Sequence, residues 1–130
     1  MPLNPPVTDW QGRRVWVVGA STGIGAALAR RLLGLGARVA LSARKEAPLR
    51  ELAAGNAHAL VLPADVTQAA TLAAAEAAIR AAWGGIDLVV VMAGTYSAMR
   101  AWELDEAKVA STFDTNVAGI YHVLAAVQPD

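Results

Sequence analysis

Cysteine is absent from this 130-residue sequence, which excludes disulfides, thiolate metal sites and cysteine nucleophiles within it. An excess of charge is also absent, because eleven lysines and arginines balance eleven aspartates and glutamates. This balance gives no support for a nucleic-acid or anionic-membrane partner. No apolar run approaches the roughly 20 residues of a membrane span, and residues 1–6 lack the regions of a secretory signal. The two histidines are far apart in the sequence, so we expect no metal site. Because neither a membrane span nor a secretory signal is predicted, we expect a cytoplasmic protein.

Apolar residues are plentiful, at 55% of the sequence, which is enough for a single domain over residues 1–130. Short apolar segments alternate with segments of helical periodicity. Strands are predicted over 14–18, 37–43, 57–62 and 86–92, and helices over 24–35, 48–54, 68–83 and 103–127. The periodicity of the first helix places Ile24, Leu28, Leu32 and Leu35 on its buried face.

The predicted strands are continuously apolar, which indicates a sheet that is covered on both faces. Because helices separate the strands, right-handed crossovers and a parallel sheet are expected. The sequence therefore predicts an α/β fold, a Rossmann-type doubly wound parallel sheet with strand order 3-2-1-4. In such a sheet a ligand binds at the carboxyl ends of the strands, where the order reverses.

Three glycines, Gly19, Gly23 and Gly25, connect the first strand to the first helix. Gly19 permits a sharp turn, Gly23 removes a side chain that would block phosphates, and Gly25 lets the helix pack closely on the sheet. Ser21 and Thr22 add hydroxyl donors, and the helix N-terminus adds unpaired N–H groups. This pattern predicts a nucleotide-binding turn; the alternative is a glycine-rich turn without a ligand.

Five motifs in order along residues 10–127 resemble those of the short-chain dehydrogenase/reductase family. They are Gly19-Ala20-Ser21-Thr22-Gly23-Ile24-Gly25, Asp65-Val66-Thr67, Gly84-Gly85-Ile86-Asp87, Met92-Ala93-Gly94 and Asn116-Val117-Ala118-Gly119. Two positions depart from the family pattern, because Val18 replaces a threonine and Met92 replaces an asparagine. The resemblance implies an NAD(P)-dependent oxidoreductase that transfers hydride between a nicotinamide and a small carbonyl or alcohol.

The resemblance also implies roles for individual residues. Asn116 corresponds to the asparagine of the family's catalytic tetrad, and Asp65 to the aspartate that contacts adenine. The implied cofactor-binding residues are Gly19, Ser21, Thr22, Gly23, Ile24, Gly25, Asp65, Val66, Ala93 and Gly94. Asp65 has a second interpretation as the N-cap of the helix that begins near Gln68, with Thr67 as a rival cap.

Cofactor preference is predicted from the end of the second strand. An NAD-binding protein usually carries an acidic residue there for the ribose 2′-hydroxyl, but this chain has Ala43 followed by Arg44 and Lys45. Arg44 can bind a 2′-phosphate through its bidentate fork. The sequence therefore favours NADP over NAD; the alternative is a solvated basic pair.

Reduction in this family requires a tyrosine as general acid, with a lysine four residues later to lower its pKa. Here Tyr96 is followed four residues later by Arg100, and Tyr121 by Ala125. The sequence therefore resembles the cofactor-binding half of the family fold, lacking its later strands and inactive by itself. The alternative is a stand-alone, non-catalytic module that binds a dinucleotide or a partner subunit.

Without later strands, the apolar segment 88–91 would form an open sheet edge. The helix over 103–127 would expose apolar side chains as well. We therefore expect a homo-oligomer formed through the fourth strand and this helix. His122, on the same helix, is expected to be a hydrogen-bonded core or interface residue rather than a metal ligand.

Overall fold

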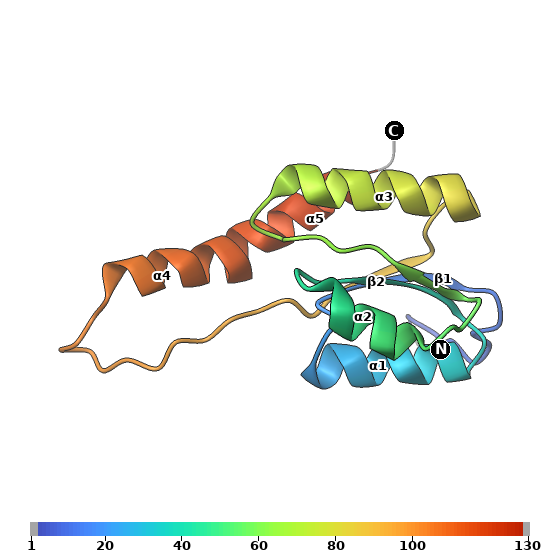
Figure 1. Cartoon of the computed structure of the whole chain (residues 1–130), viewed down its shortest axis with the longest axis horizontal. Coiled ribbons are helices and arrows are strands. Elements are labelled where there is room, and N and C mark those ends of the chain that lie inside the picture. The colour runs from blue at the N-terminus through green and yellow to red at the C-terminus, as the bar shows by residue number, and fades with distance from the viewer. Residues whose placement is uncertain (1–2, 129–130) are drawn as a thin grey trace.

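A computed structural model describes residues 3–128 and is organised by a four-stranded parallel sheet (Figure 1). The strands are β1 (Arg14–Val18), β2 (Arg38–Ser42), β3 (Ala59–Val61) and β4 (Leu88–Val91). Their order is β3-β2-β1-β4, and every neighbouring pair is parallel. The predicted Rossmann-type sheet and its order are confirmed. Strand β1 has its predicted limits, and each of the other three strands is one or two residues shorter at either end than predicted.

The helices cover both faces of the sheet, as the apolar strands predicted. They are α1 (Gly23–Gly34), α2 (Glu46–Ala53), α3 (Ala69–Trp83), α4 (Glu106–Phe113) and α5 (Gly119–Val127), with a π-helical turn η1 (Asp114–Ala118) between the last two. In Figure 1, α1 and α2 lie on one side of the sheet, and α3 and α5 on the other. Because side chains alternate along a strand, Val15 and Val17 enter the α1–α2 core, whereas Trp16 and Val18 enter the α3–α5 core.

Helix α1 buries a different face from the predicted one. Ile24 is 74% exposed and Leu35 is 38% exposed, so these two of the four predicted core positions are wrong. The buried residues are Gly25, Ala26, Ala29, Leu32 and Leu33. The face therefore contains mainly small residues in its first half, which brings the start of α1 close to the sheet.

The long helix predicted over 103–127 begins later and is interrupted. Asp105 caps α4, because its carboxylate accepts hydrogen bonds from the backbone N–H groups of Ala107 and Lys108. Asn116 lies in the π-helical turn η1, a geometry that often occurs at functional sites. Figure 1 shows α4 and the segment before it extending away from the sheet. Helix α2, in turn, begins two residues before its predicted start at Pro48.

An ion pair joins β1 to the segment before β4 at the amino end of the sheet. Arg14 Nη2 donates to Asp87 Oδ1 at 2.8 Å, and Arg14 Nε donates to Asp87 Oδ2 at 3.1 Å. These hydrogen bonds lower the pKa of Asp87 to about 2. Gly85 faces the same guanidinium, where a Cβ would lie 3.0 Å from Arg14 Nη1. The Gly84-Gly85-Ile86-Asp87 motif thus has a structural role in joining β4 to β1.

Apolar side chains remain exposed along α4, η1 and α5. They include Phe113, Val117, Ile120 and Leu124, which are exposed between 41% and 61%. Strand β4 is an edge strand, since β1 is its sole neighbour among the strands of residues 3–128. Over the same residues, no helix is long and apolar enough to cross a membrane.

Candidate functional site

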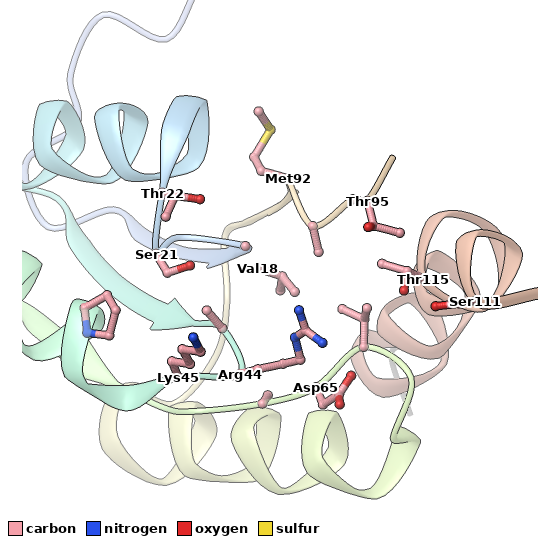
Figure 2. Close-up of a pocket in the computed structure, with 17 residues that line it drawn as sticks. Val18, Ser21, Thr22, Arg44, Lys45, Asp65, Met92, Thr95, Ser111 and Thr115 are labelled. Carbon is pink, nitrogen blue, oxygen red and sulfur yellow. The ribbon is translucent and has the colours of Figure 1, made fainter. Parts of the chain in front are cut away.

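A cleft of about 490 Å³ opens at the carboxyl ends of β1, β2 and β4 (Figure 2). This is the side of the sheet where a ligand was predicted, next to the reversal of strand order between β1 and β4. Eight of the predicted cofactor-binding residues line the cleft: Gly19, Ser21, Thr22, Arg44, Asp65, Val66, Ala93 and Gly94. The other three, Gly23, Ile24 and Gly25, belong to the first turn of α1 and do not line it.

Close backbone approaches require glycine at two positions of the turn, Gly19 and Gly25. Gly19 has φ +96°, and a Cβ there would lie 2.4 Å from the backbone N of Ala93 in the segment after β4. A Cβ on Gly25 would lie 2.0 Å from the carbonyl oxygen of Gly19. Gly25 therefore lets α1 pass over the carbonyl of its own turn, a more local role than predicted. Gly23 has φ +58° and open space around it.

The N-terminus of α1 presents N–H groups that its own residues do not cap. Thr22 is the N-cap residue but makes no side-chain cap hydrogen bond, and the first turn of the helix contains no acidic residue. Uncapped N–H donors and the positive end of the helix dipole favour an anion at this position. The hydroxyls of Ser21 and Thr22 line the same part of the cleft.

Asn116 secures the segment after β4 at the other side of the cleft. Its Oδ1 accepts from Thr95 N at 2.8 Å, and its Nδ2 donates to Thr95 O at 2.7 Å. Both ends of one amide are therefore bound to one residue. A Cβ on Gly94 would lie at an ordinary van der Waals distance, 3.5 Å, from Asn116 Oδ1. Asn116 holds this wall of the cleft in position even though Met92 supplies no amide there.

The sequence model of the family described as short chain dehydrogenase matches residues 13–130. The chain belongs to this family. A relative from Staphylococcus haemolyticus, an uncharacterised oxidoreductase, is 32% identical over 127 residues, which are 95% of this chain and 54% of that protein. The 2,3-dihydro-2,3-dihydroxybenzoate dehydrogenase of Bacillus subtilis is 31% identical over 121 residues, covering 90% of this chain and 46% of that protein.

Solved structures of the short-chain dehydrogenase/reductase family have the same fold. One from Brucella melitensis, described as a glucose/ribitol dehydrogenase, has a TM-score of 0.87 at 26% identity, with 92% of this chain and 52% of that chain covered. An actinorhodin polyketide ketoreductase variant with NADPH has a TM-score of 0.82 at 32% identity, with coverages of 89% and 46%. This chain thus spans about half the length of the relatives it matches.

Charged side chains meet at the ends of β2 and β3. Figure 2 shows Arg44 reaching into the cleft, with Asp65 beside it and Lys45 nearby. Asp65 Oδ1 accepts from both the N and the Oγ1 of Thr67. Burial raises the pKa of Asp65, but the Thr67 hydrogen bonds and the charge of Arg44 together outweigh it and lower the pKa. The cleft therefore contains a carboxylate next to Arg44, and Lys45 also lines it.

Neither Asp65 nor Thr67 caps helix α3, so the capping interpretation was wrong. The N-cap residue is Gln68, which makes no side-chain cap hydrogen bond. The hydroxyl of Thr71 instead bonds to the backbone of Asp65. Asp65 instead forms an Asx-turn, in which its carboxylate accepts a hydrogen bond from the backbone N–H of Thr67, two residues later.

Helix α5 contacts the cleft wall from behind, through Val66. A Cβ on Gly119 would lie 2.8 Å from Val66 Cγ2, so glycine is needed for the approach. His122 Nδ1 donates to Val66 O at 2.6 Å. His122 is therefore hydrogen-bonded, as predicted. Residues 3–128 contain no group of three or more potential metal-ligating side chains that could hold an ion.

Sequence reasoning assigned no cofactor-binding role to several residues that line the cleft, among them Lys45, Pro48, Met92, Thr95, Ser111 and Thr115. Ser111 and Thr115 are four residues apart in the α4–η1 segment, a spacing that places both on one helical face. That spacing was visible in the sequence. What the sequence did not show was which face of the helix points to the cleft.

Proposed function

We propose that this chain binds NADP(H) in the cleft and forms the cofactor-binding part of an oxidoreductase that acts on a small carbonyl or alcohol. When bound, the cofactor supplies or accepts a hydride at its nicotinamide ring. The observation that carries the proposal is the convergence of the uncapped α1 N-terminus, the tight glycine turn and Arg44 on one cleft.

The residues present fit a dinucleotide along the length of the cleft. Ser21, Thr22 and the N–H groups of the first α1 turn would bind the pyrophosphate. Asp65 and Val66 would contact the adenine. Ala93, Gly94 and Thr95 would lie along the nicotinamide end, where Asn116 holds the backbone of Thr95.

A 2′-phosphate is favoured over a free 2′-hydroxyl at the end of β2. Ala43 occupies the place where an NAD-binding chain usually has an acidic residue, so no carboxylate repels the phosphate there. Arg44 and Lys45 both line the cleft, and a guanidinium binds phosphate through two parallel hydrogen bonds. The carboxylate of Asp65 offsets part of this positive charge. The preference for a 2′-phosphate therefore depends on the guanidinium of Arg44 extending beyond Asp65 to the phosphate.

We also propose that residues 1–130 by themselves bind cofactor without turning it over. Their two tyrosines, Tyr96 and Tyr121, lack a lysine four residues later, so neither phenol has the cation that would lower its pKa. Asn116 is proposed to serve the catalytic site of the whole protein by fixing the segment around Thr95.

Calorimetric titration of the 130-residue chain with NADPH and with NADH tests this proposal. We expect NADPH to bind at least about tenfold more tightly, because a charge-assisted hydrogen bond contributes roughly 1.5–3 kcal/mol. The matched pair 2′,5′-ADP and 5′-AMP should show the same difference without a nicotinamide. Equal or tighter binding of NADH would contradict the NADP preference, and failure of both cofactors to bind would contradict the site.

The open edge of β4 and the exposed apolar side chains of α4, η1 and α5 support a further proposal, that the chain self-associates through them. Both surfaces face away from the covered core, and a second copy would remove them from water. Light scattering should then show a species heavier than 13.5 kDa. A monodisperse monomer at micromolar concentration would refute this assembly.

A further inference from the structure

A hydrogen-bonded bridge through Ser42 lies directly behind the cleft. Ser42 is fully buried, and it is the one polar or charged residue in the buried core of residues 3–128. Its Oγ accepts from Trp16 Nε1 at 2.9 Å and donates to Leu62 O at 2.6 Å. One hydroxyl thus links β1, β2 and the residue that follows β3.

The backbone of Ser42 also holds the glycine turn. Its carbonyl oxygen accepts from Gly19 N at 2.8 Å and from Ala20 N at 3.1 Å. In the sheet, Ser42 is paired with Val18, which lines the cleft. The start of the phosphate-binding turn is therefore attached to the same residue that carries the bridge.

The segments on either side of the bridge carry the two charged groups of the cleft. Arg44 follows Ser42 by two residues, and Asp65 follows Leu62 by three. Between them, Ala64 N donates to Ala43 O at 3.0 Å. The Trp16–Ser42–Leu62 bridge thus lies where the glycine turn, the Arg44 segment and the Asp65 segment meet.

We propose that Ser42 and Trp16 are positioning residues that set the preference for a 2′-phosphate, an inference that rests on the proposed NADP(H) binding. The glycine turn serves both cofactors, but only a 2′-phosphate depends on where Arg44 lies relative to that turn and to Asp65. The side chain of Arg44 is exposed, so it is not held in place by packing around it. The position of its guanidinium in the cleft therefore depends chiefly on the position of the Arg44 backbone. A buried, fully satisfied polar link gives that backbone one defined position, which apolar packing alone specifies less sharply.

Replacing Ser42 tests the inference in the 130-residue chain. In Ser42→Ala we expect the Kd for NADPH to rise about fivefold, the loss expected when one net hydrogen bond of roughly 1 kcal/mol no longer positions Arg44. The Kd for NADH should stay within about twofold, because its contacts do not use Arg44. Ser42→Cys keeps the shape of the side chain, with a slightly larger atom, but weakens both hydrogen bonds. Its Kd for NADPH should therefore lie between those of the unmodified chain and Ser42→Ala, and it should remain folded if Ser42→Ala does not.

Leu41→Val is the matched control, since Leu41 is a fully buried neighbour on the same strand but on the opposite face. It removes core packing without touching the bridge, so its ratio of the two Kd values should equal that of the unmodified chain. The indole N–H resonance of Trp16, identified by its loss in Trp16→Phe, should shift in both Ser42 variants and not in Leu41→Val.

Three results would overturn the inference. If the Ser42 variants weaken NADPH and NADH equally, as a general loss of stability would, the bridge is structural only. If the unmodified chain itself shows no preference for NADPH, the inference falls together with the proposed function. A preference that is present in the unmodified chain and unchanged in Ser42→Ala and Ser42→Cys overturns the inference alone.

Discussion

Gly25→Ala is expected to destabilise the chain by about 3 kcal/mol or more, at or above the upper end for overpacking, and to abolish NADPH binding. The added methyl would lie 2.0 Å from the carbonyl oxygen of Gly19 and 3.3 Å from Met92 Cβ. A backbone carbonyl cannot move aside as a flexible side chain can. Either α1 or the glycine turn must therefore shift, and both form the phosphate end of the cleft.

The control for this change lies in the same helix. Gly34 is the last residue of α1, its conformation is not left-handed, and a Cβ there meets nothing within 4 Å. Gly34→Ala is expected to stabilise the chain by about 0.5–1 kcal/mol through helix propensity. Urea unfolding and NADPH titration of both variants measure the difference. Similar midpoints for the two variants would show that the close approach at Gly25 is not what makes glycine necessary.

Arg44→Ala is expected to raise the Kd for NADPH by about 10- to 100-fold, the value of one charge-assisted contact to phosphate. The Kd for NADH should change little, because a 2′-hydroxyl offers no anion to the guanidinium. Lys45 also lines the cleft, so removing both cations should bring the two cofactors to similar affinity. Calorimetric titration at low and high salt measures the effect, which should shrink as salt screens the phosphate.

Arg30→Ala is the control that distinguishes a specific contact between Arg44 and the 2′-phosphate from the overall electrostatic effect of losing one positive charge. Arg30 is an exposed residue of α1 that does not line the cleft, and its removal changes the net charge equally. We expect its effect on both cofactors to be less than about twofold, as for a screened surface charge. An equal loss of NADPH affinity in the Arg30 and Arg44 variants would show that no specific phosphate contact exists.

The sheet and the turn could be predicted because their signals are local. Four apolar runs, separated by segments of helical periodicity, determine a parallel sheet with few alternatives. The same pattern predicted that glycine is needed at positions 19 and 25, but only the structure shows which backbone atoms each of them approaches. The short interval from the end of β2 to Arg44 likewise placed that residue in the cleft.

The buried face of α1 and the bridge behind the cleft depend on information that the periodicity lacks. Ile24 and Leu35 satisfied the hydrophobic pattern, but Ala26 and Ala29 occupy the buried face because small residues let the helix approach the sheet. Ser42 and Trp16 are 26 residues apart, and they meet only once the register of β1 and β2 is known. Sequence patterns give the strands but not their register.

The ion pair between Arg14 and Asp87 has a consequence for how the chain folds. The two residues are 73 positions apart, and all strand pairs are parallel, so no short hairpin can nucleate the sheet. Joining β4 to β1 closes the longest loop in the sheet, and the entropy of that closure is lost before the contacts compensate for it. Until β4 pairs with β1, one edge of the apolar strand β1 has no partner. During synthesis, the partly folded chain can therefore pair along this edge with other chains.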